Sequence, residues 1–158
     1  MPLLRSFFGL SGRDRVLFFE AVILTGFARM AVLILPFRWI APWIGRQVST
    51  DTAEPVEDES HTELLKRVRW AVEAASRRVP WKSLCLVQAM TARSLLRRRG
   101  LSGVVYFGLA KDDKKDLLAH AWLRSGGLII TGYGGLDKYT PVSAFAFGTL
   151  QHAVESSN

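Results

Sequence analysis

The spacing of apolar residues changes once along this chain, at Gly100, and this change restricts the possible folds more than any other feature of the sequence. Upstream of Gly100, apolar residues recur at helical spacing. Downstream they form short runs typical of strands, at 104–110, 117–124 and 128–131. The polar segment 111–116 and the pair Gly126-Gly127 suit hairpin connections, so we expect an antiparallel meander. Helices followed by a sheet predict an α+β fold, with a central helix packed on a small antiparallel sheet.

The first apolar segment predicts two helices. Ser11 can cap a helix that runs to about Leu35, where Pro36 removes a backbone donor, and a short second helix follows through Trp39 and Trp43. Charged residues leave no uncharged run of the roughly 18 residues that a membrane span needs. These charged residues are Arg15, Glu20, Arg29 and Arg38. We therefore expect a buried helix pair that packs on the domain or offers a groove to a partner.

The middle of the chain predicts a linker followed by two more helices. Residues 47–60 are polar and acidic, which is typical of a surface linker. An amphipathic helix then ends near Val79-Pro80, and a further helix has Ser83 as its plausible N-cap and Gly100 as its left-handed stop. We expect one compact domain made of an apolar helical region (1–46), an acidic linker (47–60) and a region that carries the chemistry (61–158).

Composition narrows the possible partners and the location of the protein. The chain has 158 residues, 49% of them hydrophobic, which is enough for one domain with a core. Its net charge of +7 would suit nucleic acid, an anionic membrane surface or an acidic peptide. The arginines of 93–99 lack the interleaved aromatics of a nucleic-acid site, so we favour a solvated helix end and expect no nucleic-acid partner. The N-terminus does not resemble a secretory signal, so we expect a cytoplasmic protein.

Cys85 and His120 are the candidate reactive pair. Cys85 is the only cysteine, which excludes an internal disulfide and a thiolate zinc site, and we expect no metal and no cofactor. It falls in the first turn of a predicted helix, where backbone N–H groups and the helix dipole favour a thiolate. Alternation places His120 and Trp122 on one face of a strand. If the helix start packs against that face, the pair can act as nucleophile and base. The alternative is a buried cysteine and a structural histidine.

Three motifs occur in the order and spacing of a known family. They are Ser-Leu-Cys-Leu-Val-Gln-Ala at 83–89, Leu-Leu-Arg-Arg-Arg-Gly at 95–100 and Ala-His-Ala-Trp-Leu at 119–123. Together with the 35–38 and 45–46 stretches, they resemble the lasso-peptide biosynthesis B protein in its stand-alone leader-peptidase form. The resemblance runs from about 79 to 131. It implies a transglutaminase-like, papain-like fold and a cysteine peptidase that removes the leader from a ribosomally made precursor peptide.

The resemblance also assigns roles to residues. It implies Cys85 as nucleophile and His120 as base, with a third residue that is usually an Asp on the strand after the histidine. This sequence departs from the pattern there, since its nearest acid is Asp137, beyond Gly134-Gly135. Asp137 could reach back to orient the imidazole, and Thr131 or a backbone carbonyl is the alternative.

Further residues complete the expected site. The backbone N–H of Cys85 should contribute to an oxyanion hole, with Trp81 or Gln88 as a possible supplement and Trp122 as a subsite candidate. The resemblance implies a precursor peptide, a separate leader-recognition domain and an ATP-using macrolactam cyclase as partners. For the recognition domain we expect a docking surface that includes Phe37, Trp39 and Trp43.

Two other functions use the same residues. One is a non-catalytic module of this fold that binds a peptide and delivers it to a partner, which the absent Asp after His120 favours. The other is an acyltransferase, in which an amine replaces water as the acceptor.

Overall fold

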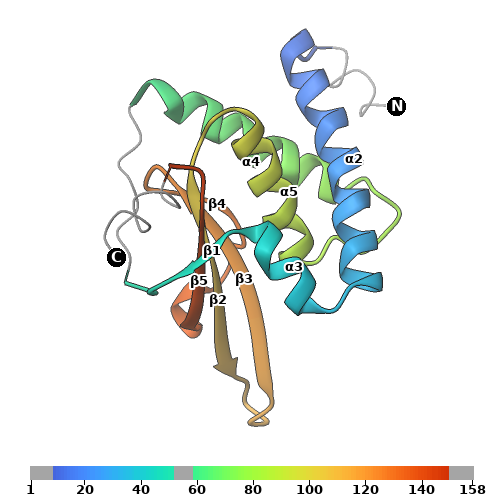
Figure 1. Cartoon of the computed structure of the whole chain (residues 1–158). Helices are drawn as coiled ribbons and strands as arrows, with labels where there is room; N and C mark the ends of the chain where they lie inside the picture. Colours follow the sequence, from blue (N-terminus) through green and yellow to red (C-terminus); the bar gives the residue numbers. More distant parts are fainter. Residues whose placement is uncertain (1–8, 52–58, 150–158) are drawn as a thin grey trace.

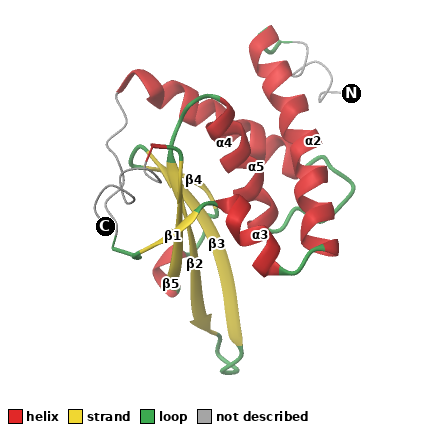
Figure 2. Cartoon of the chain, in the orientation of Figure 1, coloured by secondary structure: helices red, strands yellow, loops and turns green. Residues whose placement is uncertain are grey.

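Helices occupy the first part of the described chain and strands most of the second (Figures 1 and 2). The computed structural model describes residues 9–51 and 59–149. Its helices are α2 (Gly12–Ile34), α3 (Phe37–Ile44), α4 (Thr62–Ser76) and α5 (Cys85–Arg98), with 3₁₀ turns η1 (Glu59–His61) and η2 (Leu136–Lys138). Its strands are β1 (Arg46–Val48), β2 (Gly103–Lys111), β3 (Leu117–Ser125), β4 (Leu128–Thr131) and β5 (Thr140–Phe147). This arrangement confirms the α+β class.

The strands form one antiparallel sheet in the order β1-β5-β2-β3-β4. The β2-β3-β4 meander is the expected one. The sequence did not predict β5, which lies between β1 and β2, nor β1. Because Gln47 and Val48 pair with Phe145 and Ala144, the linker expected from 47 starts instead with strand residues. The acidic part of that linker, 52–58, lies outside the described residues.

The start of α2 and the end of α5 lie where the capping residues in the sequence predict them. The Ser11 side chain accepts a hydrogen bond from the Asp14 N–H, which confirms it as the cap of α2. At the end of α5, the N–H groups of Gly100 and Leu101 donate to the carbonyls of Arg97 and Leu96. With Gly100 at φ +73°, this is a Schellman motif, as the basic run and glycine predict.

The start of α5 differs from the expectation by one residue. The N-cap position belongs to Leu84, and the expected cap Ser83 lies one residue before it. The Ser83 hydroxyl is instead 2.9 Å from the Ser76 hydroxyl at the end of α4. Cys85 is therefore the first residue of the helix, and the preceding segment is fastened to α4.

The helices cover one face of the sheet in two layers, with α4 and α5 against the strands and α2 packed on those two helices (Figure 1). The main core lies between helices and sheet and includes Leu95, Val105 and Leu123, all fully buried. A second apolar cluster lies on the opposite face of the sheet, around Tyr106 and Trp122. Both faces of the sheet are therefore covered, and the two sides of β3 meet different neighbours.

The arginine cluster of α5 makes internal contacts. Arg99 bonds the Glu20 carboxylate of α2 at 2.6 Å, and Arg98 approaches the same carboxylate at 3.2 Å. Arg93 donates to the Ile44 carbonyl at the end of α3, and burial, with a smaller contribution from Arg97, lowers the pKa of Arg93 to about 10. The end of α5 thus holds α2 and α3 in place, which is a structural role for much of this basic cluster.

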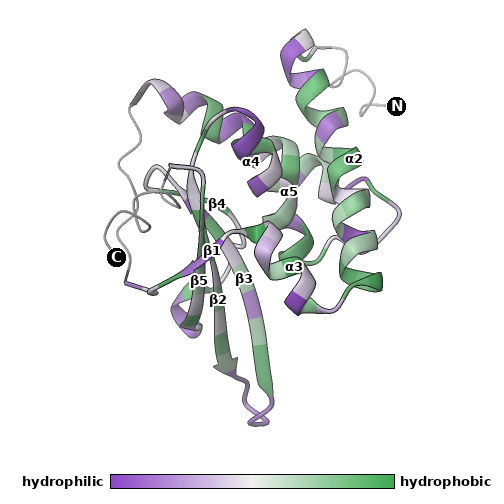
Figure 3. Ribbon diagram, in the orientation of Figure 1, coloured by the Kyte–Doolittle hydropathy of each residue, from purple (hydrophilic) through white to green (hydrophobic). Residues whose placement is uncertain are grey.

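Helix α2 is more apolar than the charged residues along it suggest. By length and composition it is the one helix among the described residues that could cross a membrane, and 22% of its most apolar window is buried. Soluble core helices and signal sequences share these properties, so they do not establish a span. Figure 3 shows apolar residues along much of α2.

Candidate functional site

Cys85 occupies the first position of α5 and is partly exposed. The first backbone bond of this helix runs from the Gln88 N–H to the Leu84 carbonyl. The N–H groups of Cys85, Leu86 and Val87 therefore precede the helical ladder, as the first N–H groups of any helix do. A thiolate, or an oxyanion formed beside it, would lie at the positive end of the helix dipole.

Cys85 opens onto an apolar cavity of about 390 Å³. Leu86 and the Phe37 ring of α3 line the same space as the thiol. The segments 107–109 of β2 and 119–121 of β3 border it as well, together with Val142 and Ser143 of β5. Phe37 is anchored by edge-to-face contacts to Phe107 and Phe145, at ring-centroid distances of 5.3 and 6.4 Å. The cavity is thus a site for apolar groups next to the only thiol of the chain.

The His120 imidazole is held by three neighbours. Its Nε2 lies 2.7 Å from the Gly132 carbonyl oxygen, which can only accept. Nε2 is therefore the donor of this hydrogen bond. The ring also stacks on Tyr139 at 4.8 Å and lies 6.1 Å from the Trp122 ring.

These contacts place the imidazole on the face of the sheet away from α5. β2 and β3 pair without a register shift, so His120 shares a face with Trp122 and with the opposing Gly108. A Cβ added to Gly108 would meet the Trp122 ring at 2.7 Å, which identifies this as the face of the second cluster. The fully buried Leu123 belongs to the core between helices and sheet, and Ala121 shares its face of β3 by alternation.

Cys85 and His120 both line this cavity, but their side chains lie on opposite faces of β3. The helix start packs against the face of Ala121, and not against the face of His120 as we had expected from the sequence. His120 is one of the residues that line the cavity, and its imidazole stacks on Tyr139. Contact between thiol and imidazole requires the side chain to come to the α5 side of β3.

The orienting contact of His120 comes from the Gly132 backbone. Of the alternatives to an acid, the backbone carbonyl is the one that meets the imidazole. Asp137 lies on η2 and is exposed, and the structure does not bring it to His120. Thr131 opposes Leu123 and is buried on the helix side of the sheet, away from the ring.

The supplementary oxyanion candidates lie elsewhere. The Gln88 side-chain amide donates to the Ser83 carbonyl at 2.8 Å, which supports the turn before Cys85. Trp81 packs against Gly26 of α2, with a ring carbon 3.4 Å from the position of an added Cβ. Trp122 is 6% exposed and stacks on Tyr106, so it supports His120 from beneath. The backbone N–H groups at the start of α5 are the oxyanion donors that the geometry supports.

The three proposed docking residues separate into two groups. Phe37 belongs to the cavity of Cys85. Trp39 and Trp43, one helical turn apart on α3, are 60% and 59% exposed. These two lie outside the cavity lining, whereas Phe37, 46% exposed, is shared between the cavity and the surface.

Sequence reasoning missed two neighbours of His120. Tyr139 gave no signal, because nothing in its sequence context predicts a contact with a strand two elements earlier. Gly132 follows a strand, and a glycine there hints at a positive φ, which is +73° in the structure. Every residue type has a backbone carbonyl, so the sequence does not identify the one that orients an imidazole.

The family model of the Transglutaminase-like superfamily matches residues 31–144 of this chain. This segment runs from the last turn of α2 into β5 and includes Cys85 and His120. Comparisons with curated proteins and with solved structures give no match. The superfamily includes cysteine peptidases and acyltransferases, and its fold is typical of cysteine-type enzymes. Because the match covers most of the chain, this protein belongs to the transglutaminase-like superfamily.

Proposed function

We propose that this protein is a cysteine peptidase that cleaves the leader from a ribosomally synthesised lasso-peptide precursor, together with a separate leader-recognition domain. The observation that carries the proposal is the position of Cys85, which begins α5 and opens onto an apolar cavity within a transglutaminase-like domain. The three motifs shared with the leader-peptidase family support the choice of substrate.

In this reaction the Cys85 thiolate attacks the carbonyl carbon at the leader/core junction. The resulting oxyanion lies at the start of α5, where backbone N–H groups stabilise it. His120 takes the thiol proton and gives it to the leaving core amine, and water then hydrolyses the thioester to release the leader. Incubation with a precursor and recognition domain, followed by mass spectrometry, tests the proposal. Release of intact leader and core is expected, and an uncut precursor contradicts it.

His120 has to cross to the α5 side of β3 for this step. We assign the movement to residues 119–121, which line the cavity and lie in the part of β3 that, among the described residues, pairs with β2 alone. Catalytic hydrogen bonds often form only once substrate is bound. A peptide in the cavity would contact the backbone of this same segment.

The orientation of His120 favours a second candidate, a non-catalytic module that binds and delivers the peptide. In that case the Gly132 and Tyr139 contacts are structural, and the imidazole never meets the thiol. An acyltransferase would use the catalytic arrangement and yield an amide in place of the acid, which product analysis with an added amine distinguishes.

Thiol labelling separates the peptidase from the binding module. With an iodoacetamide probe at neutral pH in the presence of precursor, His120→Ala is expected to slow the labelling of Cys85 about tenfold or more, because the imidazole no longer takes the thiol proton. His61→Ala, which changes a histidine of η1, is the matched control and should label at the wild-type rate. Equal rates for all three proteins in the presence of precursor would support the binding module.

The exposed tryptophans of α3 are the proposed dock for the recognition domain. Trp39→Ala/Trp43→Ala is expected to weaken binding of that domain about 30-fold, because buried tryptophans dominate most interface energies. Isothermal titration measures the dissociation constant. Leu117→Ala, which truncates an exposed apolar residue on β3, is the control. An unchanged dissociation constant in the tryptophan variant would place the dock elsewhere.

A further inference from the structure

The outward face of α2 carries a continuous apolar stripe. Seven of its side chains are more than half exposed, and they follow one another at helical spacing along the helix. Phe27, at 71%, is the most exposed of them. They are Val16, Phe19, Ile23, Phe27, Met30, Leu33 and Ile34. From the first to the last, the stripe spans about 27 Å at the rise of an α-helix. An apolar surface this continuous marks an interaction site.

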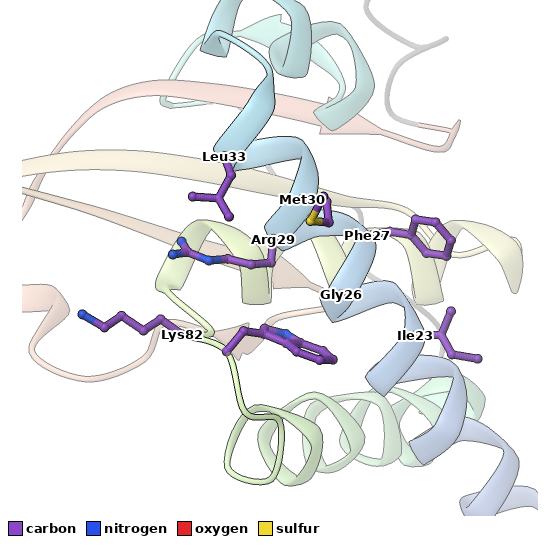
Figure 4. Close-up of a pocket in the computed structure, with 8 residues that line it drawn as sticks. Ile23, Gly26, Phe27, Arg29, Met30, Leu33 and Lys82 are labelled. Atoms are coloured by element: carbon purple, nitrogen blue, oxygen red, sulfur yellow. The ribbon is translucent and has the colours of Figure 1, made fainter.

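A groove runs along the second half of this stripe. It has a volume of about 630 Å³ and lies between α2 and residues Trp81 and Lys82 of the loop before α5. Gly26 forms its floor, where the Trp81 ring approaches the helix. Figure 4 shows Arg29 and Lys82 extending to the same side of the groove, away from Ile23 and Phe27.

The charges around this face are cationic and unbalanced. Both acids of α2 are neutralised from the interior side, Asp14 by Arg67 at 2.6 Å and Glu20 by Arg99 at 2.6 Å. Arg29 and Lys82 form no ion pair within the described residues 9–51 and 59–149, and the groove has no acidic lining residue there. The surface therefore offers apolar side chains flanked by cations, which complements an anionic lipid surface.

The transglutaminase-like domain does not account for this stripe. The family match begins at residue 31, whereas five of the seven stripe residues precede it. The stripe is also distinct from the cavity of Cys85, with which its groove shares no lining residue.

We propose that α2 docks the protein on an anionic membrane surface, with its outward stripe in the interfacial layer and Arg29 and Lys82 at the lipid phosphates. The helix meets the length and composition of a membrane segment, so transfer of its exposed side into lipid is favourable. Its inward side packs in the core through Leu17 and Ala21, and the Glu20 ion pair ties it to α5. A crossing orientation would break these contacts, so the helix lies along the surface.

Flotation of the full-length protein with vesicles tests the proposal. The protein is expected to float with phosphatidylcholine–phosphatidylglycerol vesicles and more weakly with phosphatidylcholine alone. Ile23→Gln/Phe27→Gln should lower the partition coefficient about 100-fold, because two large apolar side chains no longer enter the interface. Arg29→Gln/Lys82→Gln should lower the partition coefficient about 30-fold on anionic vesicles and leave it unchanged on vesicles of phosphatidylcholine alone. Leu117→Gln/Leu118→Gln, which changes two exposed apolar residues of β3, is the matched control.

Four results would overturn the proposal. The first is absence of wild-type flotation, and the second is an equal loss in the Leu117→Gln/Leu118→Gln control. The third is a wild-type dimer, seen by analytical ultracentrifugation without lipid, that Ile23→Gln/Phe27→Gln dissociates, because a second copy would then cover the stripe. Flotation that survives alkaline carbonate would mean a crossing helix and would also contradict surface docking. Because Cys85 and His120 are unchanged in every variant, leader cleavage without membranes reports separately on the peptidase.

Discussion

Replacement of Cys85 by alanine is expected to lower the rate of leader cleavage by about 10⁴-fold or more, because removal of a nucleophile abolishes the covalent route. The chain has one cysteine, so no other thiol can replace it. The fold should be retained, since the side chain is partly exposed at a helix start and alanine is a good helix former. Mass spectrometry of a precursor incubated with the variant and the recognition domain gives the rate.

Arg97→Ala serves as the matched control for Cys85→Ala. Arg97 is an exposed residue on the same helix, far from its start, so cleavage should proceed at the wild-type rate. Thermal unfolding of both variants checks the fold. A Cys85→Ala protein that is folded and still cleaves the precursor at the wild-type rate would end the peptidase proposal.

Gly132→Ala is expected to reduce the free energy of unfolding by about 2–4 kcal/mol, from left-handed backbone strain and overpacking together. Gly132 has φ +73°, and an added Cβ would lie 2.4 Å from the Ala121 carbonyl oxygen and 2.9 Å from the Trp122 Cβ. The first of these is backbone, so the 132–135 segment must move away from β3. That movement would also carry the Gly132 carbonyl away from His120.

Gly100→Ala isolates the backbone part of this effect. Gly100 has the same φ of +73°, but an added Cβ there meets no atom within 4 Å. Gly100→Ala should therefore reduce the free energy of unfolding by only about 1 kcal/mol, which is the strain of a left-handed alanine. Urea denaturation of the three proteins gives the free energies. Equal losses in both variants would show that the Ala121 carbonyl does not restrict Gly132.

The sequence predicted the parts of the fold that have local causes. Ser11 and Gly100 set helix ends by hydrogen bonds within a few residues, and the hairpin connections brought β2, β3 and β4 together as expected. β1 has only three residues, too few for a pattern, and its partner β5 lies nearly a hundred residues away by register. Such a pairing depends on the whole fold.

The site was predictable in its residues but not in its geometry. Alternation correctly put His120 with Trp122, yet it could not say which face of β3 the helices would cover. Both faces of the second half of that strand are buried, with Trp122 in one cluster and Leu123 in the other. Hydrophobicity therefore carries no information about which side Cys85 approaches. The choice is made by the long-range packing of α5.

The position of β5 also determines the order in which the molecule can assemble during synthesis. Its hydrogen bonds join Arg46–Val48 on one side and β2 on the other. Until residues 140–147 emerge, each of those two strands therefore lacks its β5 partner. Helices α2, α4 and α5 can associate earlier, since their contacts need only the preceding chain. An incomplete chain would thus present an open β2 edge, with which a strand of another nascent chain could pair.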